Sequence, residues 1–138
     1  MTLDQRLKAY GLQEKTIKGD GNCQFRSLSD QLFGTPDRHV EVRRMVIAQL
    51  MRNADDYSVF VPDDYSDYVR KMSKDGEWGD HLTLQAASDV YGRRICVLST
   101  YEKNFLIEIT PKNMRNPRVL WLSFWAEVHY NSIYPASS

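Results

Sequence analysis

The sequence predicts an α+β fold in which N-terminal helices pack on a mainly antiparallel C-terminal sheet. Two observations carry this prediction. Apolar residues recur at helical spacing in the segments before Gly92, and short apolar or alternating runs follow that glycine. The 138 residues suit one compact domain with a real core, so we expect residues 1–138 to form a single domain.

Capping residues and prolines delimit the expected helices. Asn22 is a candidate N-cap for a helix that Gly34 ends, and Thr35 followed by Pro36 is typical of the start of the next helix. Pro62 is expected to open a further helix. The helices are expected at 3–10, 22–34, 35–50, 62–72 and 80–91, with a short extended segment at 15–17.

The strands are expected after the last helix. Residues 95–99 form a continuous apolar run, residues 105–109 alternate between apolar and other side chains, and residues 119–124 are apolar and aromatic. Residues 127–133 form a further extended segment, in which side chains two positions apart share a face.

Composition excludes several classes of protein. The 18 Lys and Arg residues balance the 18 Asp and Glu residues, so no basic field is available to bind nucleic acid. No stretch approaches the roughly 18 apolar residues that a membrane span needs, and the N-terminus lacks a signal segment. We therefore expect a soluble, monomeric chain in the cytoplasm or nucleus, with neither nucleic acid nor membrane as a partner.

Cys23 is the candidate nucleophile. It lies where a loop containing Gly19 and Gly21 turns into a helix, and the N–H groups and positive end of a helix start favour a thiolate and lower the thiol pKa. Cys96 lies within the apolar run 95–99 and is expected to be core. In a reducing compartment a disulfide between the two cysteines is not expected.

A cysteine nucleophile needs a base, and the chain offers three histidines. His39 and His81 lie at expected helix starts, His39 at a site that is usually solvated. His129 is the preferred base because it lies on the extended segment 127–133, on the same face as Asn131. An amide there could fix the imidazole tautomer and leave the other ring nitrogen to accept the thiol proton.

Two residues compete for the task of orienting His129. Asn131 is one, and Asp20, three residues before Cys23, is the other, since its carboxylate could bind the imidazole or brace the loop that shapes an oxyanion site. Alternatively, His129 is an ordinary strand residue and Asp20 an ordinary turn residue. The spacing leaves these alternatives open.

Three blocks of sequence resemble the ovarian tumour (OTU) family of cysteine deubiquitinases. They are DGNCQFRS at 20–27, WGDH at 78–81 with Leu84, Ala86 and Ala87 after it, and WAEVHYNS at 125–132. The resemblance is ordered and spans nearly the whole chain. It implies a papain-type cysteine protease fold, with Cys23 as nucleophile, His129 as base, and Asp20 and Asn131 as supporting polar groups.

The resemblance also implies a reaction and a partner. The reaction is hydrolysis of the isopeptide or peptide bond after the C-terminal glycine of ubiquitin, with ubiquitin or polyubiquitin as partner and no metal or organic cofactor. Ubiquitin's C-terminal tail carries arginines, and residues 55–80 hold eight acidic against three basic residues. These acids are candidates for contacting the tail, although helix-start acids on a solvated face would give the same composition. Trp78 and Trp125 could likewise line a substrate channel or fill core, whereas Trp121 is expected in the core.

Two other functions remain open at this point. One is a ubiquitin-binding scaffold without catalysis, against which the intact Cys23 and His129 argue. The other is a cysteine hydrolase that acts on a ubiquitin-like modifier, which the spacing does not exclude. A zinc site is not expected, since Cys23 and the three histidines lack the paired short spacings of structural zinc ligands.

Overall fold

The computed structural model describes residues 1–136, which form helices and one five-stranded sheet. The α-helices are α1 (Leu3–Ala9), α2 (Cys23–Phe33), α3 (His39–Arg52), α4 (Ala54–Tyr57), α5 (Tyr65–Met72) and α6 (His81–Tyr91). Two short 3-10 helices are η1 (Pro36–Arg38) and η2 (Ser58–Phe60). The strands are β1 (Leu12–Lys15), β2 (Ile95–Ser99), β3 (Leu106–Ile109), β4 (Leu120–Trp125) and β5 (His129–Pro135).

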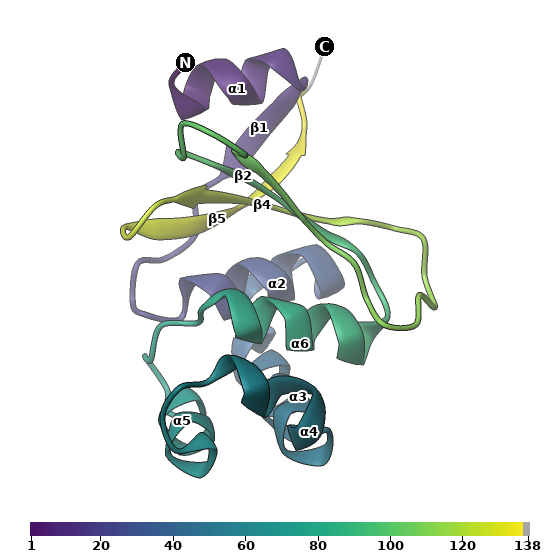
Figure 1. The fold of residues 1–138 in the computed structure, drawn as a ribbon. Coiled ribbons are helices and arrows are strands. Elements are labelled where there is room, and N and C mark those ends of the chain that lie inside the picture. Colours follow the sequence, from purple (N-terminus) through teal and green to yellow (C-terminus); the bar gives the residue numbers. More distant parts are fainter. Residues whose placement is uncertain (137–138) are drawn as a thin grey trace.

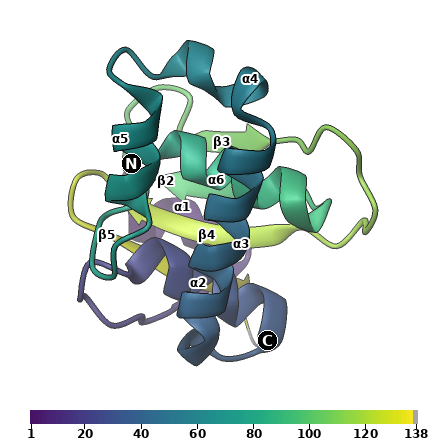
Figure 2. The ribbon, with the colours of Figure 1, turned by 90° about the horizontal axis from the view of Figure 1, so that it is seen from below.

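The elements form layers around the sheet (Figure 1). Helix α1 covers one face, where it contacts β1 and β2. Helices α2 and α6 lie against the other face, and α3, α4 and α5 form a further layer below them (Figure 1). Seen from below, α3 crosses α2 and α6, both of which it contacts (Figure 2). No helix within residues 1–136 is long and apolar enough to cross a membrane.

The strand order is β1-β5-β4-β2-β3, and among the strands of residues 1–136 only the β2/β4 pair is parallel. The prediction of a mainly antiparallel sheet is therefore confirmed. The parallel pair arises because β3 ends opposite the start of β2, with Ile109 across from Ile95. Residues 110–119 then pass this start of β2, and β4 begins on its other side with Leu120 across from Ile95.

Strand β1 is the main element that the sequence pattern did not predict. The extended segment was expected at 15–17, whereas the strand occupies Leu12–Lys15 and pairs with β5 as an edge of the sheet. Its four residues include Gln13, Glu14 and Lys15, so they carry little apolar signal. Half-buried and exposed residues alternate along β1, but its polar composition hides this period of two, and pairing with β5 places the segment in the sheet.

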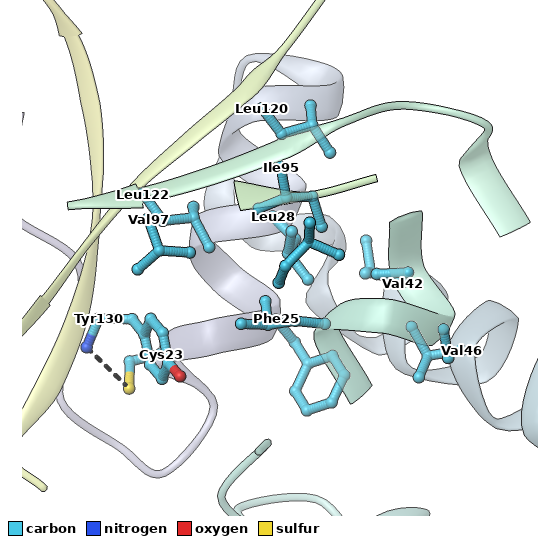
Figure 3. Close-up of a cluster of buried hydrophobic side chains, with 14 of the residues drawn as sticks. Cys23, Phe25, Leu28, Val42, Val46, Ile95, Val97, Leu120, Leu122 and Tyr130 are labelled. Carbon is cyan, nitrogen blue, oxygen red and sulfur yellow. Dashed lines mark hydrogen bonds between the residues drawn. The ribbon is translucent and has the colours of Figure 1, made fainter. Parts of the chain in front are cut away.

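The core lies mainly between the sheet and α2, α3 and α6 (Figure 3). Successive side chains of a strand point to opposite faces of the sheet. Ile95 and Val97 therefore face α2, whereas Leu98 faces α1. The buried side chains between sheet and helices include Phe25, Leu28, Val42, Val46, Leu120 and Leu122. Cys96 is 2% exposed within β2, as expected of a core residue.

The helix ends agree with the sequence at two glycines and differ at other positions. The helix expected at 35–50 is divided into η1, which Thr35 caps, and α3, which begins at His39 and ends at Arg52. Gly34 and Gly92 end α2 and α6 in the left-handed conformation, with φ of 76° and 63°. The helix expected to open at Pro62 begins instead at Tyr65, because the Asp64 carboxylate accepts the Asp67 N–H and caps it. Asn22 occupies the N-cap position of α2, but its side chain makes no capping hydrogen bond.

Candidate active site

Cys23 is the first residue of α2 and lies against the start of β5. Its side chain is 3% exposed, and Sγ accepts a hydrogen bond from the Tyr130 N–H at 3.5 Å (Figure 3). Tyr130 directly follows His129, so this contact brings together two segments 107 residues apart in sequence. The fold therefore places the candidate nucleophile next to the backbone of the candidate base.

The N–H groups at the helix start lower the Cys23 pKa as expected, but burial of the thiol outweighs them, so the expected net lowering is wrong. Burial raises the pKa of the thiol above its usual value, and the N–H groups of Tyr130 and Gln24 only partly offset this effect. The helix start therefore does not by itself favour the thiolate in the folded chain. The nucleophilicity of Cys23 depends on a base that removes the proton.

His129 and Asn131 lie on one face of β5, as the period of two predicts. His129 Nε2 is 2.8 Å from Asn131 Oδ1, which also accepts the Ile17 N–H at 2.8 Å. Asn131 Nδ2 donates to Glu14 Oε2 at 3.0 Å. An N–H on one side and a carboxylate on the other fix which end of the amide is oxygen. Since that oxygen only accepts, His129 Nε2 is the donor.

The tautomer that follows leaves His129 Nδ1 without a proton when the imidazole is neutral. The ring edge formed by Cε1 and Nδ1 lies beside the loop that leads into Cys23, since a Cβ placed on Gly19 would lie 3.8 Å from each of these two atoms. Gly19 and His129 are thus neighbours across the site. The arrangement provides a proton acceptor on the side of the ring that faces residues 19–22, the loop that leads into Cys23 and is called the cysteine loop below.

Asp20 bonds to groups of its own loop and of α2, and it does not orient the imidazole. Its carboxylate pairs with Arg26 at 2.7 Å and accepts the Asn22 N–H at 3.1 Å. The hydrogen bond from Arg26 holds the pKa of Asp20 well below its usual range. Of the two candidates, Asn131 contacts His129, whereas Asp20 braces the loop.

The cysteine loop is locked to the segment before α6. Gly21 has a φ of 82°, and a Cβ on it would lie 2.2 Å from Gly76 O, so both conformation and space require glycine. Asn22 Oδ1 accepts from Gly76 N and from Arg43 Nη2, each at 2.8 Å. These contacts explain why the expected capping role of Asn22 is wrong: its amide oxygen is already engaged.

The loop geometry also narrows the set of oxyanion donors. The Asn22 N–H donates to Asp20, so it is not free for a substrate oxygen. The N–H groups of Cys23 and Gln24 belong to the first turn of α2, where no acceptor within the helix exists. The start of α2 is therefore the better oxyanion site than the loop that precedes it.

The other two histidines have different environments. His39 was expected to be solvated, but it is only 9% exposed at the start of α3, directly after η1, which contacts α2. Burial and the nearby Arg26 lower its pKa. His81 is exposed at the start of α6. Within residues 1–136 no group of three or more His, Cys, Asp or Glu side chains could hold a metal ion.

The three tryptophans differ in exposure and contacts. Trp121 packs against the apolar cluster under α1, as expected, and Trp125 joins the same cluster while its Nε1 donates to Glu14 Oε2 at 2.8 Å. Trp78 is 44% exposed and lies on the segment 76–80 that contacts the cysteine loop. Glu14, which two of the site's side chains contact, was not singled out from the sequence.

Most acids of residues 55–80 have partners within the chain. Asp56 pairs with Lys112, Asp67 with Arg70 and Glu77 with Lys71, while Asp64 and Asp80 cap helices. Asp63 and Asp64 also line a hollow of about 410 Å³ beside the exposed Phe60. Helix caps and ion pairs within the chain thus account for five of the eight acids.

Comparisons with known proteins agree with this geometry. Residues 18–134 match the model of a family described as OTU-like cysteine protease. The chain is 54% identical over 133 residues to OVARIAN TUMOR DOMAIN-containing deubiquitinating enzyme 9 of Arabidopsis thaliana, covering 96% of this chain and 39% of that protein. Deubiquitinating enzyme 12 of the same plant is 53% identical over 130 residues, with coverages of 94% and 59%. The chain therefore spans less than two thirds of either relative.

Solved structures show the same fold. The OTU domain of OTUD1 superposes with a TM-score of 0.81 at 20% identity, covering 95% of this chain and 91% of that one. An OTU domain solved in complex with ubiquitin gives a TM-score of 0.74 at 18% identity, covering 88% and 69%. The predicted papain-type OTU fold is confirmed, and together with the family match it shows that this chain belongs to the OTU-like cysteine proteases.

Proposed function

We propose that the chain is a thiol-dependent deubiquitinase that hydrolyses the isopeptide or peptide bond after the C-terminal glycine of ubiquitin. The observation that carries the proposal is that the buried Cys23 Sγ accepts the N–H of Tyr130, the residue after His129, while Asn131 holds His129 Nε2 and the opposite edge of the ring lies beside Gly19. The relatives named as deubiquitinating enzymes support the reaction class. The domain bounds 1–138, the monomeric state and the cytoplasmic or nuclear location stay predictions from the sequence.

The chemistry follows from the geometry. His129 Nδ1 removes the Sγ proton, and Cys23 attacks the glycine carbonyl carbon of ubiquitin. The N–H groups at the start of α2 stabilise the oxyanion. The imidazolium then gives its proton to the departing lysine amine, leaving a thioester. Water, deprotonated by the same imidazole, hydrolyses the thioester and regenerates the thiol.

Asn131 supports each proton transfer by holding the Nε2–H. When His129 takes the thiol proton, the positive ring keeps its hydrogen bond to Asn131 Oδ1, so no rotation is needed before the proton is passed on. Asp20 contributes through the Arg26 pair, which keeps the loop before Cys23 in place. The two residues therefore act on different parts of the site.

The first test is trapping with ubiquitin that bears a C-terminal electrophile. The parent chain and Cys96→Ala are expected to form the adduct, and Cys23→Ala is expected to form none, as mass spectrometry would record. Because burial raises the Cys23 pKa, the rate of trapping in the parent should increase with pH from neutrality upward.

An adduct that persists in Cys23→Ala would overturn the assignment of the nucleophile. If the parent forms no adduct although it is folded, the scaffold function gains support. The same reagent built on a ubiquitin-like modifier then tests the alternative substrate.

The second test compares the two supporting residues. His129→Ala should lower kcat by about 10²–10⁴-fold, the usual contribution of a general base. Asn131→Ala should cost about 10–100-fold in kcat, because the ring loses its orienting partner. Asp20→Ala should cost less in kcat and lower the melting temperature, since Arg26 loses its partner. Equal and negligible losses from Asn131→Ala and Asp20→Ala in steady-state kinetics would contradict the orienting role.

The third test concerns the acidic hollow as a contact for the arginines of ubiquitin's tail. The double variant Asp63→Asn/Asp64→Asn removes both charges, and asparagine keeps the N-cap of α5. KM for ubiquitin substrates should rise and its salt dependence weaken, with kcat unchanged. Asp4→Asn, on α1 across the sheet, is the control. An unchanged KM and salt dependence would remove this pair from the contact surface.

A further inference from the structure

Glu14 gathers three hydrogen bonds on one carboxylate oxygen. Its Oε2 accepts from Ser123 Oγ at 2.6 Å, from Trp125 Nε1 at 2.8 Å and from Asn131 Nδ2 at 3.0 Å. The donors come from β4 and β5, whereas Glu14 lies on β1 at the edge of the sheet. The side chain therefore reaches from the edge strand past β5 to β4.

This position is unusual for a charged residue on a short edge strand. Glu14 shares a face with Leu12, which packs against the apolar cluster under α1, and it is half-buried. A glutamate in such a place costs desolvation energy unless donors satisfy it. Here three donors converge on it, so the carboxylate is the acceptor around which the local side chains are arranged.

Two of the three donors, Asn131 and Trp125, lie next to the base. Asn131 holds His129 Nε2, and Trp125 is the residue directly across from His129 in the β4/β5 pair. Residues opposite each other in an antiparallel pair present neighbouring side chains. Glu14 therefore fixes both the amide and the indole next to the imidazole.

We propose that Glu14 is a positioning residue for the reaction, setting the amide of Asn131 and the indole of Trp125 so that His129 Nδ1 faces Cys23. This role rests on the proposed hydrolase function. Glu14 acts through Asn131, because an acceptor opposite Nδ2 keeps the amide oxygen turned toward His129. The Ile17 N–H supports the same orientation from the other side of the amide.

Position 14 requires a charged hydrogen-bond acceptor of the length of glutamate. A glutamine keeps the length and one acceptor oxygen but loses the charge, and hydrogen bonds to a charged acceptor are roughly twice as strong. Alanine removes the acceptor and leaves the Asn131 and Trp125 donors unpaired. The activity is therefore expected to be highest with glutamate at this position, lower with glutamine and lowest with alanine.

The experiment measures hydrolysis of ubiquitin bearing a C-terminal fluorogenic amide, together with melting temperature, for Glu14→Ala and Glu14→Gln. Glu14→Ala should lower kcat by about 10–100-fold with KM nearly unchanged, as for other residues that orient a ligating or catalytic side chain. Glu14→Gln should recover most of this activity. The control is Glu108→Ala on β3, the opposite edge of the sheet, which should behave as the parent.

A second readout separates this proposal from the assignment of substrate. In a Cys96→Ala background, the rate at which a small chloroacetamide alkylates Cys23 reports on the base without ubiquitin. Glu14→Ala should slow this reaction, and Glu14→Gln should partly restore it. If the parent fails to hydrolyse ubiquitin but Glu14→Ala still slows alkylation, the substrate assignment fails and the positioning role stands.

Three results would overturn the positioning role. One is parent-like kcat and alkylation in a folded Glu14→Ala. Another is a rise in KM with kcat unchanged. The third is an equal loss in Glu108→Ala. If Glu14→Ala does not fold, the comparison passes to Glu14→Gln, and full parental rates there together with full stability would count against a role for the charge.

Discussion

The side-chain amide of Asn131 is the contact on which the candidate site depends. Its oxygen accepts from Ile17 and from His129, and its nitrogen donates to Glu14, so it joins the loop before α2, strand β5 and strand β1. The residue is 8% exposed. An amide buried to this degree is stable only when its polar atoms are paired, and here the pairing also decides the imidazole tautomer.

The burial of Cys23 gives that tautomer its importance. Packing the sulfur beneath β5 raises its pKa, so the helix start alone does not produce a resting thiolate. A base with a free nitrogen on the correct side is then required, and the Asn131 contact leaves Nδ1 in that state. The core that stabilises the fold thus creates the need for a precisely held base.

The chain itself allowed much of the site to be predicted. Cys23, His129 and Asn131 were recognisable because each lies within a short motif whose local geometry, a helix start or a strand with a period of two, limits where the side chain points. The layered α+β fold followed from the same periodicities. Asp20 could not be assigned, because its partner Arg26 lies one turn into α2 and competes with the imidazole for the carboxylate.

The role of Glu14 could not be predicted from the sequence, for a different reason. Strand β1 is short and mostly polar, and its pairing with β5 depends on a register between segments more than a hundred residues apart. The one available signal was a charged residue on the same face as Leu12, which only the structure shows to be half-buried. The burial of His39 was missed likewise, since it depends on how η1 turns the chain between two helices.

The most direct measurement is the position of the proton on His129. Long-range ¹H–¹⁵N correlation spectra of the histidine-labelled chain, recorded where the imidazole is neutral, distinguish the two ring nitrogens. The structure predicts a proton on Nε2 and none on Nδ1. A proton on Nδ1 with a bare Nε2 would contradict the account, because Asn131 would then not hold the ring as a base for Cys23.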